Sequence, residues 1–166
     1  MGAIHQKKFD IEFIDRTQNI IKEYKGIYNI TLLLNCLLGL VVLPSEYYRR
    51  KTYKFFDKDI SEYPKLNKLT SEISFTPTKY NYKTKQHEND KTTLKNLIKK
   101  VRNGISHQHI ECVDKKGKWT GVTIRDFNTR NGNKQELEIK WTPKQLKEFA
   151  LFVADSYKSE INKISV

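Results

Sequence analysis

The chain has 166 residues, of which 37% are hydrophobic and 30% are charged, with seven glycines and four prolines. These proportions exclude a disordered or low-complexity chain and predict one globular domain, spanning 1–166, with a sizeable core. The net charge of +12 indicates a polyanionic partner such as RNA, although a basic face that only aids solubility is the alternative.

Two helical patterns occupy the first part of the chain. Apolar residues recur at three-and-four spacing over 9–25, which predicts an amphipathic helix. Residues 31–43 are apolar nearly all round and predict a central buried helix, which Pro44 should end. This segment is too short to cross a bilayer, and the chain does not start with a signal-peptide pattern, so a cytoplasmic protein is expected. Cys36 and Cys112 are expected to be reduced thiols.

Residues 45–90 are less regular. Over 45–63, aromatic residues alternate with Arg and Lys, a mixture suited to stacking on bases and binding phosphates. The alternative is that these aromatic residues pack on a neighbouring helix and leave their basic companions in solvent. Residues 64–90 contain Pro64, Pro77 and many Lys, Thr, Asn and Ser, so we expect a loop with one short helix there.

A further amphipathic helix is predicted from Thr92. Its apolar stripe consists of Leu94, Leu97, Ile98, Val101 and Ile105. At about 100° per residue, six polar side chains fall off this stripe, those of Lys95, Lys99, Arg102, Asn103, Ser106 and His107. Residues 76–110 also carry a net charge of +6, half of the total. The helix is therefore expected to present its polar groups and part of the basic excess on one exposed side.

After Glu111 the pattern changes to alternation. Apolar and polar residues alternate on both sides of Asn131-Gly132, which predicts a β-hairpin over about 119–141, a small appendage on a helical body. Thr142, Pro143 and Gln145 then match the start of a capped helix. The buried face of this last helix is predicted to contain Leu146, Phe149, Ala150, Val153, Tyr157 and Ile161.

The most informative pattern is Arg102, Asn103 and His107 in the arrangement Arg-Asn-x-x-x-His. Chance placement of the arginines, asparagines and histidines would give roughly 0.01 such spacings. The motif, together with Thr31–Glu46 (TLLLNCLLGLVVLPSE) after a helix containing Arg16-Thr17, resembles the HEPN ribonucleases, in particular a plasmid- and defence-associated bacterial branch. This resemblance implies a mainly-α fold, an up-and-down helical bundle with the β-hairpin inserted before the last helix.

The resemblance also implies a homodimer in which two motifs face each other and form one composite RNase site. Arg102 and His107 lie about 140° apart around one helix, so a single motif gives only a one-sided contact. The implied reaction is attack by the ribose 2′-hydroxyl on the adjacent phosphorus, without metal or other cofactor. His107 would be the general base or acid, Arg102 would bind the phosphate, and Asn103 would hold the catalytic groups in place. The candidate substrate contacts are Ser106, Lys95 and Lys99.

Other interpretations of the motif and of the function remain open at this point. Arg102 and Asn103 would also suit an ordinary helix surface, with His107 at its end. His107 and His109 form His-x-His, but no third ligand has a suggestive spacing, so no metal site is expected. Besides a toxin or defence effector, with an antitoxin or defence-system component as partner, the alternatives are a non-catalytic HEPN-type RNA-binding or adaptor domain and a DNA-binding module.

Overall fold

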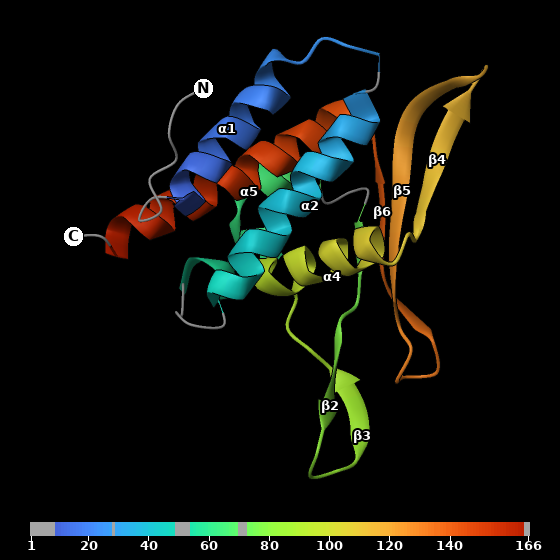
Figure 1. Ribbon diagram of the computed structural model, residues 1–166. Coiled ribbons are helices and arrows are strands. Elements are labelled where there is room, and N and C mark those ends of the chain that lie inside the picture. The colour runs from blue at the N-terminus through green and yellow to red at the C-terminus, as the bar shows by residue number, and fades with distance from the viewer. Residues whose placement is uncertain (1–8, 28, 49–53, 70–72, 165–166) are drawn as a thin grey trace.

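The computed structural model describes residues 9–27, 29–48, 54–69 and 73–164 (Figure 1). Its helices are α1 (Phe9–Glu23), α2 (Asn29–Tyr48), the 3-10 helices η2 (Lys54–Asp57) and η3 (Ile60–Glu62), α3 (Pro64–Asn67), α4 (Leu94–Ser106) and α5 (Pro143–Ile164). Its strands are β1 (Ile73–Phe75), β2 (Thr78–Asn81), β3 (Gln86–Asn89), β4 (Ile110–Lys115), β5 (Lys118–Asn128) and β6 (Lys134–Trp141).

The described chain forms a helical layer and an antiparallel sheet. Helices α1, α2 and α5 lie together, and α4 packs against α2 on one side and against β5 and β6 on the other (Figure 1). The sheet has four strands in the order β1-β6-β5-β4, and β2 pairs with β3 in a separate two-stranded hairpin. The predicted mainly-α bundle is therefore wrong, because an antiparallel sheet makes up one of the two layers.

The sheet is larger than the predicted hairpin. Its outer strands were not predicted because their sequences carry only weak strand signals. Strands β5 and β6 form the hairpin expected over 119–141, but they are the central pair of the sheet rather than an appendage. Every residue of β4 after Ile110 is exposed, so β4 lacks the alternation that reveals a half-buried strand. Strand β1 has three residues and lies in the segment that we expected to be a loop. The β2–β3 hairpin lies in the same segment and was also missed.

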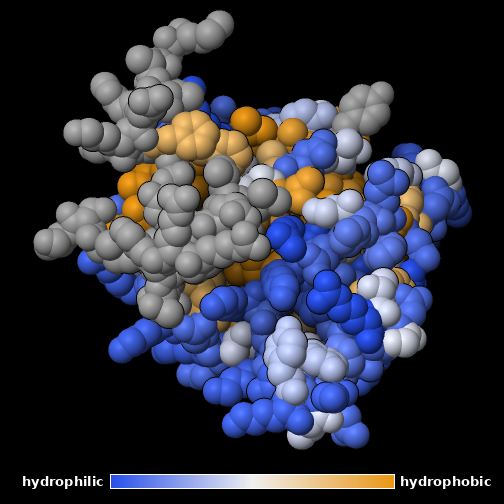
Figure 2. All heavy atoms as spheres, turned by 60° about the horizontal axis from the view of Figure 1, so that its bottom comes forward, coloured by the Kyte–Doolittle hydropathy of each residue, from blue (hydrophilic) through white to orange (hydrophobic). Residues whose placement is uncertain are grey.

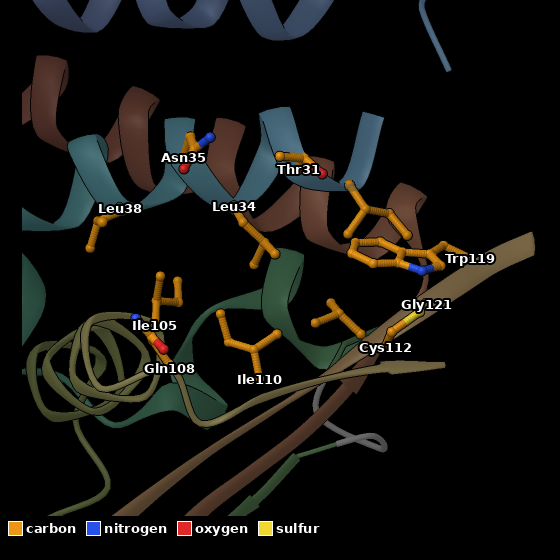
Figure 3. Close-up of a pocket in the computed structure, with 12 residues that line it drawn as sticks. Thr31, Leu34, Asn35, Leu38, Ile105, Gln108, Ile110, Cys112, Trp119 and Gly121 are labelled. Atoms are coloured by element: carbon orange, nitrogen blue, oxygen red, sulfur yellow. The ribbon is translucent and has the colours of Figure 1, made fainter. Parts of the chain in front are cut away.

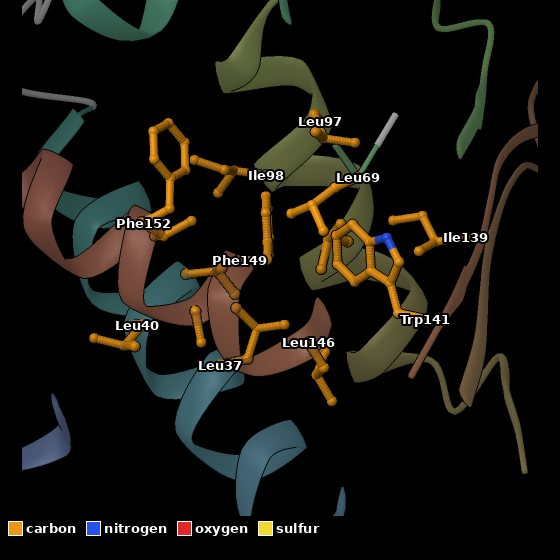
Figure 4. Packing of buried hydrophobic residues seen from close by; sticks show 14 of the residues in the cluster. Leu37, Leu40, Leu69, Leu97, Ile98, Ile139, Trp141, Leu146, Phe149 and Phe152 are labelled. Atoms are coloured by element: carbon orange, nitrogen blue, oxygen red, sulfur yellow. The ribbon is translucent and has the colours of Figure 1, made fainter. Parts of the chain in front are cut away.

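The hydrophobic core lies where the sheet meets the helices (Figure 4). Trp141 of β6 packs on Phe149 of α5, with ring centroids 4.8 Å apart. The predicted apolar stripe of α4 is buried along its whole length. The predicted apolar face of α5 is also buried, apart from Ile161, which is half-buried. The predicted buried faces of these two helices are therefore confirmed, because each helix has one continuous apolar side.

The end of α2 and the aromatic residues of 54–63 bear on two further predictions. Helix α2 continues through Pro44 to Tyr48, so the proline does not end it; a proline removes one helical hydrogen bond without necessarily stopping the helix. The aromatic residues of 54–63 pack in the interior: Phe56 is fully buried and stacks on Tyr157 with centroids 4.8 Å apart. This confirms the packing interpretation for that part, whereas residues 49–53 and the side chains of residues 45–48 lie outside what the structure describes.

None of the helices in the described ranges combines the length and the apolar character needed to cross a membrane.

Candidate active site

The motif occupies the last turn of α4 and the residue that follows it. Thr93 precedes the helix in an extended conformation, and its hydroxyl oxygen accepts a hydrogen bond from the backbone N–H of Asn96 at 3.2 Å. This threonine cap fixes where the helix begins. The buried apolar stripe then fixes its rotation, so that the polar residues of the motif lie on the remaining surface.

Arg102 and Asn103 are joined through their side chains. The Oδ1 atom of Asn103 accepts hydrogen bonds from Nη2 of Arg102 at 2.7 Å and from Nε of Arg102 at 3.2 Å. Both side chains are half-buried. The other N–H donors of the guanidinium take no part in this pairing. Asn103 therefore orients the cation while leaving it able to bind an anion.

His107 is the residue at which α4 ends. Its backbone N–H donates to the carbonyl of Asn103 at 2.9 Å, and the chain reverses at Gln108, whose φ is +58°. The N–H groups of Gln108 and His109 donate to carbonyls in the last turn of the helix, at 3.1 and 2.9 Å. These two bonds form a Schellman ending, in which glycine usually occupies the left-handed position. The exposed His107 side chain is thus carried on a well-bonded backbone.

The glycine of the motif allows α4 to approach β5 closely. A Cβ atom at Gly104 would overlap the carbonyl oxygen of Arg125 and the side chain of Ile124. Just beyond the motif, the N–H of Arg125 donates to the carbonyl of His109 at 2.9 Å. Glycine within a helix costs about 1 kcal/mol relative to alanine, and this close approach explains its presence. Sequence reasoning missed Gly104 and Arg125, because alternation predicts a strand but not the helix that it crosses.

The sheet also orients the second histidine of this segment. The ring of His109 meets Phe127 of β5 nearly edge to face, with centroids 5.1 Å apart. The rings of His107 and His109 are 6.0 Å apart. Within the described residues, His, Cys, Asp and Glu side chains form no group of three that could hold a metal ion.

Lys100, for which the sequence predicted no partner, reaches a buried polar cluster of the sheet. Its ammonium pairs with Asp126 at 3.0 Å and with Glu136, whose carboxylate also accepts hydrogen bonds from Thr78 and, at 2.9 Å, from Asn128. Burial favours a lower pKa for Lys100, but its hydrogen bonds to Glu136 and Asp126 outweigh burial and raise the pKa. Burial likewise favours a higher pKa for Glu136, but its hydrogen bonds keep the pKa below the ordinary value.

A β-bulge brings Glu136 into this cluster. In the β5–β6 pairing, Asp126 lies opposite Leu137 and Phe127 lies opposite Gln135, so Glu136 has no residue directly opposite. Regular alternation would turn Glu136 away from the face that Leu137 occupies, whereas an extra residue in one strand re-aims a side chain. The positive charge of Lys100 is therefore neutralised by carboxylates of β5 and β6.

The predicted substrate contacts Ser106, Lys95 and Lys99 are all exposed. Lys95 lies 3.8 Å from a carboxylate oxygen of Asp57, and both side chains are about half exposed, so this ion pair is weak and open to competition. The structure thus brings Arg102 and Asn103 into contact and leaves these three residues on the surface of the same helix.

An open apolar groove begins beside the motif. It has a volume of about 530 Å³ and lies between α2, the end of α4 and the β4–β5 hairpin. Figure 3 shows Leu34 and Leu38 of α2 facing Ile105 and Ile110 across it, with Trp119 at one end. Gln108, directly after His107, belongs to its wall. Trp119 is 55% exposed, so the groove presents apolar surface to the solvent, as interaction sites commonly do.

Comparison with known families gives a match over almost the whole chain. The family model described as HEPN pEK499 p136 matches residues 1–164. No curated protein and no solved structure matches the chain significantly.

Proposed function

The chain belongs to the HEPN pEK499 p136 family, and we propose that it is a metal-independent endoribonuclease acting as a bacterial toxin or defence effector. The family match confirms the relationship that the motif suggested. The observation that carries the enzymatic proposal is the end of α4, where the Asn103 side chain holds Arg102 and the Asn103 carbonyl receives the backbone N–H of His107. A cation suited to phosphate and a side chain suited to proton transfer thus lie on one short, well-bonded segment.

The proposed reaction is displacement at phosphorus within the RNA chain. The ribose 2′-oxygen forms a bond to phosphorus as the bond to the 5′-oxygen breaks, leaving a 2′,3′-cyclic phosphate and a 5′-hydroxyl. A base removes the 2′-proton, an acid supplies a proton to the departing oxygen, and the guanidinium of Arg102 stabilises the charge that develops on the phosphate. Asn103 is a positioning residue because it acts through Arg102.

The reaction needs a base and an acid on opposite sides of the phosphorus, which favours a paired site. One copy of the motif supplies a single histidine, on the exposed end of one helix. Two copies facing each other supply two copies of His107 and two of Arg102, so that one imidazole is the base while the other is the acid. We therefore propose a homodimer.

The groove beside the motif is the proposed contact with the second copy. It continues from Gln108, next to His107, along an apolar wall that ends at the exposed Trp119. A partner seated there would cover apolar surface and bring its own helix end close to the first. Trp is also the side chain that most often dominates the energy of an interface.

The proposal predicts cleavage of single-stranded RNA in excess EDTA. We expect fragments with 2′,3′-cyclic phosphate and 5′-hydroxyl ends, because the nucleophile belongs to the substrate and no metal is required. The ends are checked by mass spectrometry of a short labelled RNA. Its all-deoxy counterpart, which lacks the nucleophile, should remain intact. Binding of RNA without cleavage would favour the non-catalytic adaptor, and cleavage that EDTA abolishes would exclude the metal-free reaction.

Replacing Trp119 with aspartate is expected to raise the dissociation constant of the dimer by about 30-fold or more, since loss of an interface tryptophan typically costs at least about 2 kcal/mol. RNA cleavage should fall in parallel. The measurement is light scattering after size exclusion across a concentration series, with cleavage assayed on the same samples.

Trp119→Phe is the matched control, because it keeps an apolar aromatic ring and should keep both the dimer and the activity. Trp119 is largely exposed, so neither substitution removes a core residue. A Trp119→Asp variant that stays dimeric and active would show that the groove is not the contact between copies.

A further inference from the structure

The β2–β3 hairpin projects from the body of the molecule without contributing to its core (Figure 1). Thr78–Asn81 and Gln86–Asn89 pair in an antiparallel register, and none of their residues is buried. A two-stranded hairpin that buries none of its residues is only marginally stable in water. Its stability must therefore come from contacts at its base and within its turn.

The base of the hairpin is fastened to the β5–β6 end of the sheet. The Thr78 hydroxyl accepts hydrogen bonds from Asn128 at 3.1 Å and Asn131 at 3.4 Å, and it donates to Glu136 of the buried polar cluster. Further along, Nε2 of His87 is 3.0 Å from the carbonyl oxygen of Arg130 and must be the donor, because a carbonyl only accepts. The hairpin is thus held at a set angle to the body.

The turn of the hairpin is also ordered by its own side chains. Oδ1 of Asn81 accepts hydrogen bonds from the backbone N–H groups of Lys83 at 2.9 Å and Thr84 at 3.3 Å, while its Nδ2 donates to Glu88 at 2.7 Å. Lys85 completes the turn with a φ of +55°. Binding at this turn would therefore lose little conformational entropy.

One face of the hairpin is aromatic and open. Tyr80 of β2 lies directly opposite His87 of β3, with ring centroids 5.2 Å apart, and the ring of Tyr82, in the turn, contacts that of Tyr80, so the three side chains lie together. Tyr80 is 43% exposed and Tyr82 is 84% exposed. Their rings are 5.1 Å apart with an angle of 85°, an edge-to-face contact that leaves ring surface uncovered. Tyr82 therefore contributes little to packing within the chain.

Positively charged residues lie in the turn of the hairpin and in and beside the adjoining β5–β6 loop. Lys83 and Lys85 lie in the turn itself and are exposed, while Arg130 and Lys134, both exposed, lie in and beside the neighbouring β5–β6 loop. The Glu88 carboxylate accepts hydrogen bonds from Asn81 and Thr84 within the hairpin. Figure 2 shows that hydrophilic side chains cover this end of the molecule, which suits a polar, charged ligand better than an apolar one.

We propose that the β2–β3 hairpin holds single-stranded RNA, with Tyr82 and Tyr80 stacking on bases and Lys83 and Lys85 binding phosphates. Open aromatic rings beside cations are the chemistry that recognises unpaired nucleotides, because every base has a π face and every linkage carries a charge. The inference rests on the proposed function for the identity of the substrate, and it assigns the hairpin to a binding step separate from cleavage at α4.

The test measures binding of the full chain to a fluorescent 12-nucleotide oligouridylate in which every 2′-hydroxyl is methylated, so that it cannot be cut. Tyr82→Ala is expected to weaken binding about 5- to 150-fold, since loss of one stacking side chain typically costs about 1–3 kcal/mol. Tyr82→Phe should bind like the wild type because the ring remains. Lys83→Ala/Lys85→Ala should reduce the slope of log affinity against log salt by about 1.4, the value for two single-strand phosphates.

Lys22→Ala/Lys25→Ala is the matched control, because it removes the same charge from exposed residues in the last turn of α1 and just after it, and this end of α1 lies away from the hairpin (Figure 1). Hairpin variants that bind like this control would overturn the inference, as would equal binding of a blunt RNA duplex, whose bases are not free to stack. If unmodified RNA is cut while the hairpin variants bind normally, only the hairpin inference fails. If binding depends on the hairpin but unmodified RNA is never cut, only the enzymatic proposal fails.

Discussion

Replacing His107 with alanine is expected to slow RNA cleavage by about 10²- to 10⁴-fold, the usual contribution of a general acid or base. The side chain is exposed, and the backbone N–H that ends α4 is retained in the variant, so the fold should be unaffected. Arg102→Ala should cause a loss of about 10²- to 10³-fold, and Arg102→Lys should not restore activity, because an ammonium cannot reproduce a planar, bidentate contact. The measurement is the single-turnover rate with saturating protein.

His109→Ala is the matched control for His107→Ala, because both histidines are exposed and only two residues apart. His109 faces Phe127, and its replacement should leave cleavage near the wild-type rate. Thermal unfolding of all variants should coincide, and the inactive variants should still bind RNA and no longer arrest growth when expressed. If instead the His109 variant were inactive and the His107 variant active, the assignment of the catalytic histidine would be wrong.

Replacing Lys100 with methionine is expected to lower the free energy of unfolding at pH 7 by about 3–5 kcal/mol, the typical cost of breaking a buried ion pair from one side. The side chains of Asp126 and Glu136 are 3% and 0% exposed, so the lost cation cannot be replaced readily by water. Methionine keeps most of the volume and isolates the loss of charge. Urea unfolding measures the change, and Lys99→Met, the exposed neighbour, should be close to wild type.

The pH dependence should identify the cause of this loss. In the wild type, hydrogen bonds hold the pKa of Glu136 below its ordinary value of 4.5, so its contribution is present above that pH and is lost as pH falls through the native pKa. Without Lys100, burial of Glu136 is opposed only by the hydrogen bonds from Thr78 and Asn128, so the pKa of Glu136 rises relative to that in the wild type, and the stability deficit of the variant should shrink as the pH falls from 7 to 5. A deficit that stays constant over this range would contradict the role of buried carboxylates.

Much of the candidate site was predictable because its residues are close together in the sequence. Arg102, Asn103 and His107 lie within six residues on one amphipathic helix, and the apolar stripe alone determines that they face away from the core. Local spacing also predicted the Thr142 cap, where the hydroxyl of Thr142 and the side chain of Gln145 each accept the other residue's backbone N–H, at 3.3 and 2.9 Å.

The sequence by itself thus determined α4 and the capped last helix, because each depends on a pattern within a short segment, and its Arg-Asn-x-x-x-His motif carried the resemblance to the HEPN family. Only the tertiary structure decided that Lys100 pairs with two buried carboxylates, that Gly104 touches β5 and that the β2–β3 hairpin projects beside the β5–β6 loop. Each of these features depends on a pairing between residues far apart in the chain. Strand pairing and charge burial are set by such distant partners, and no periodic pattern within one segment specifies them.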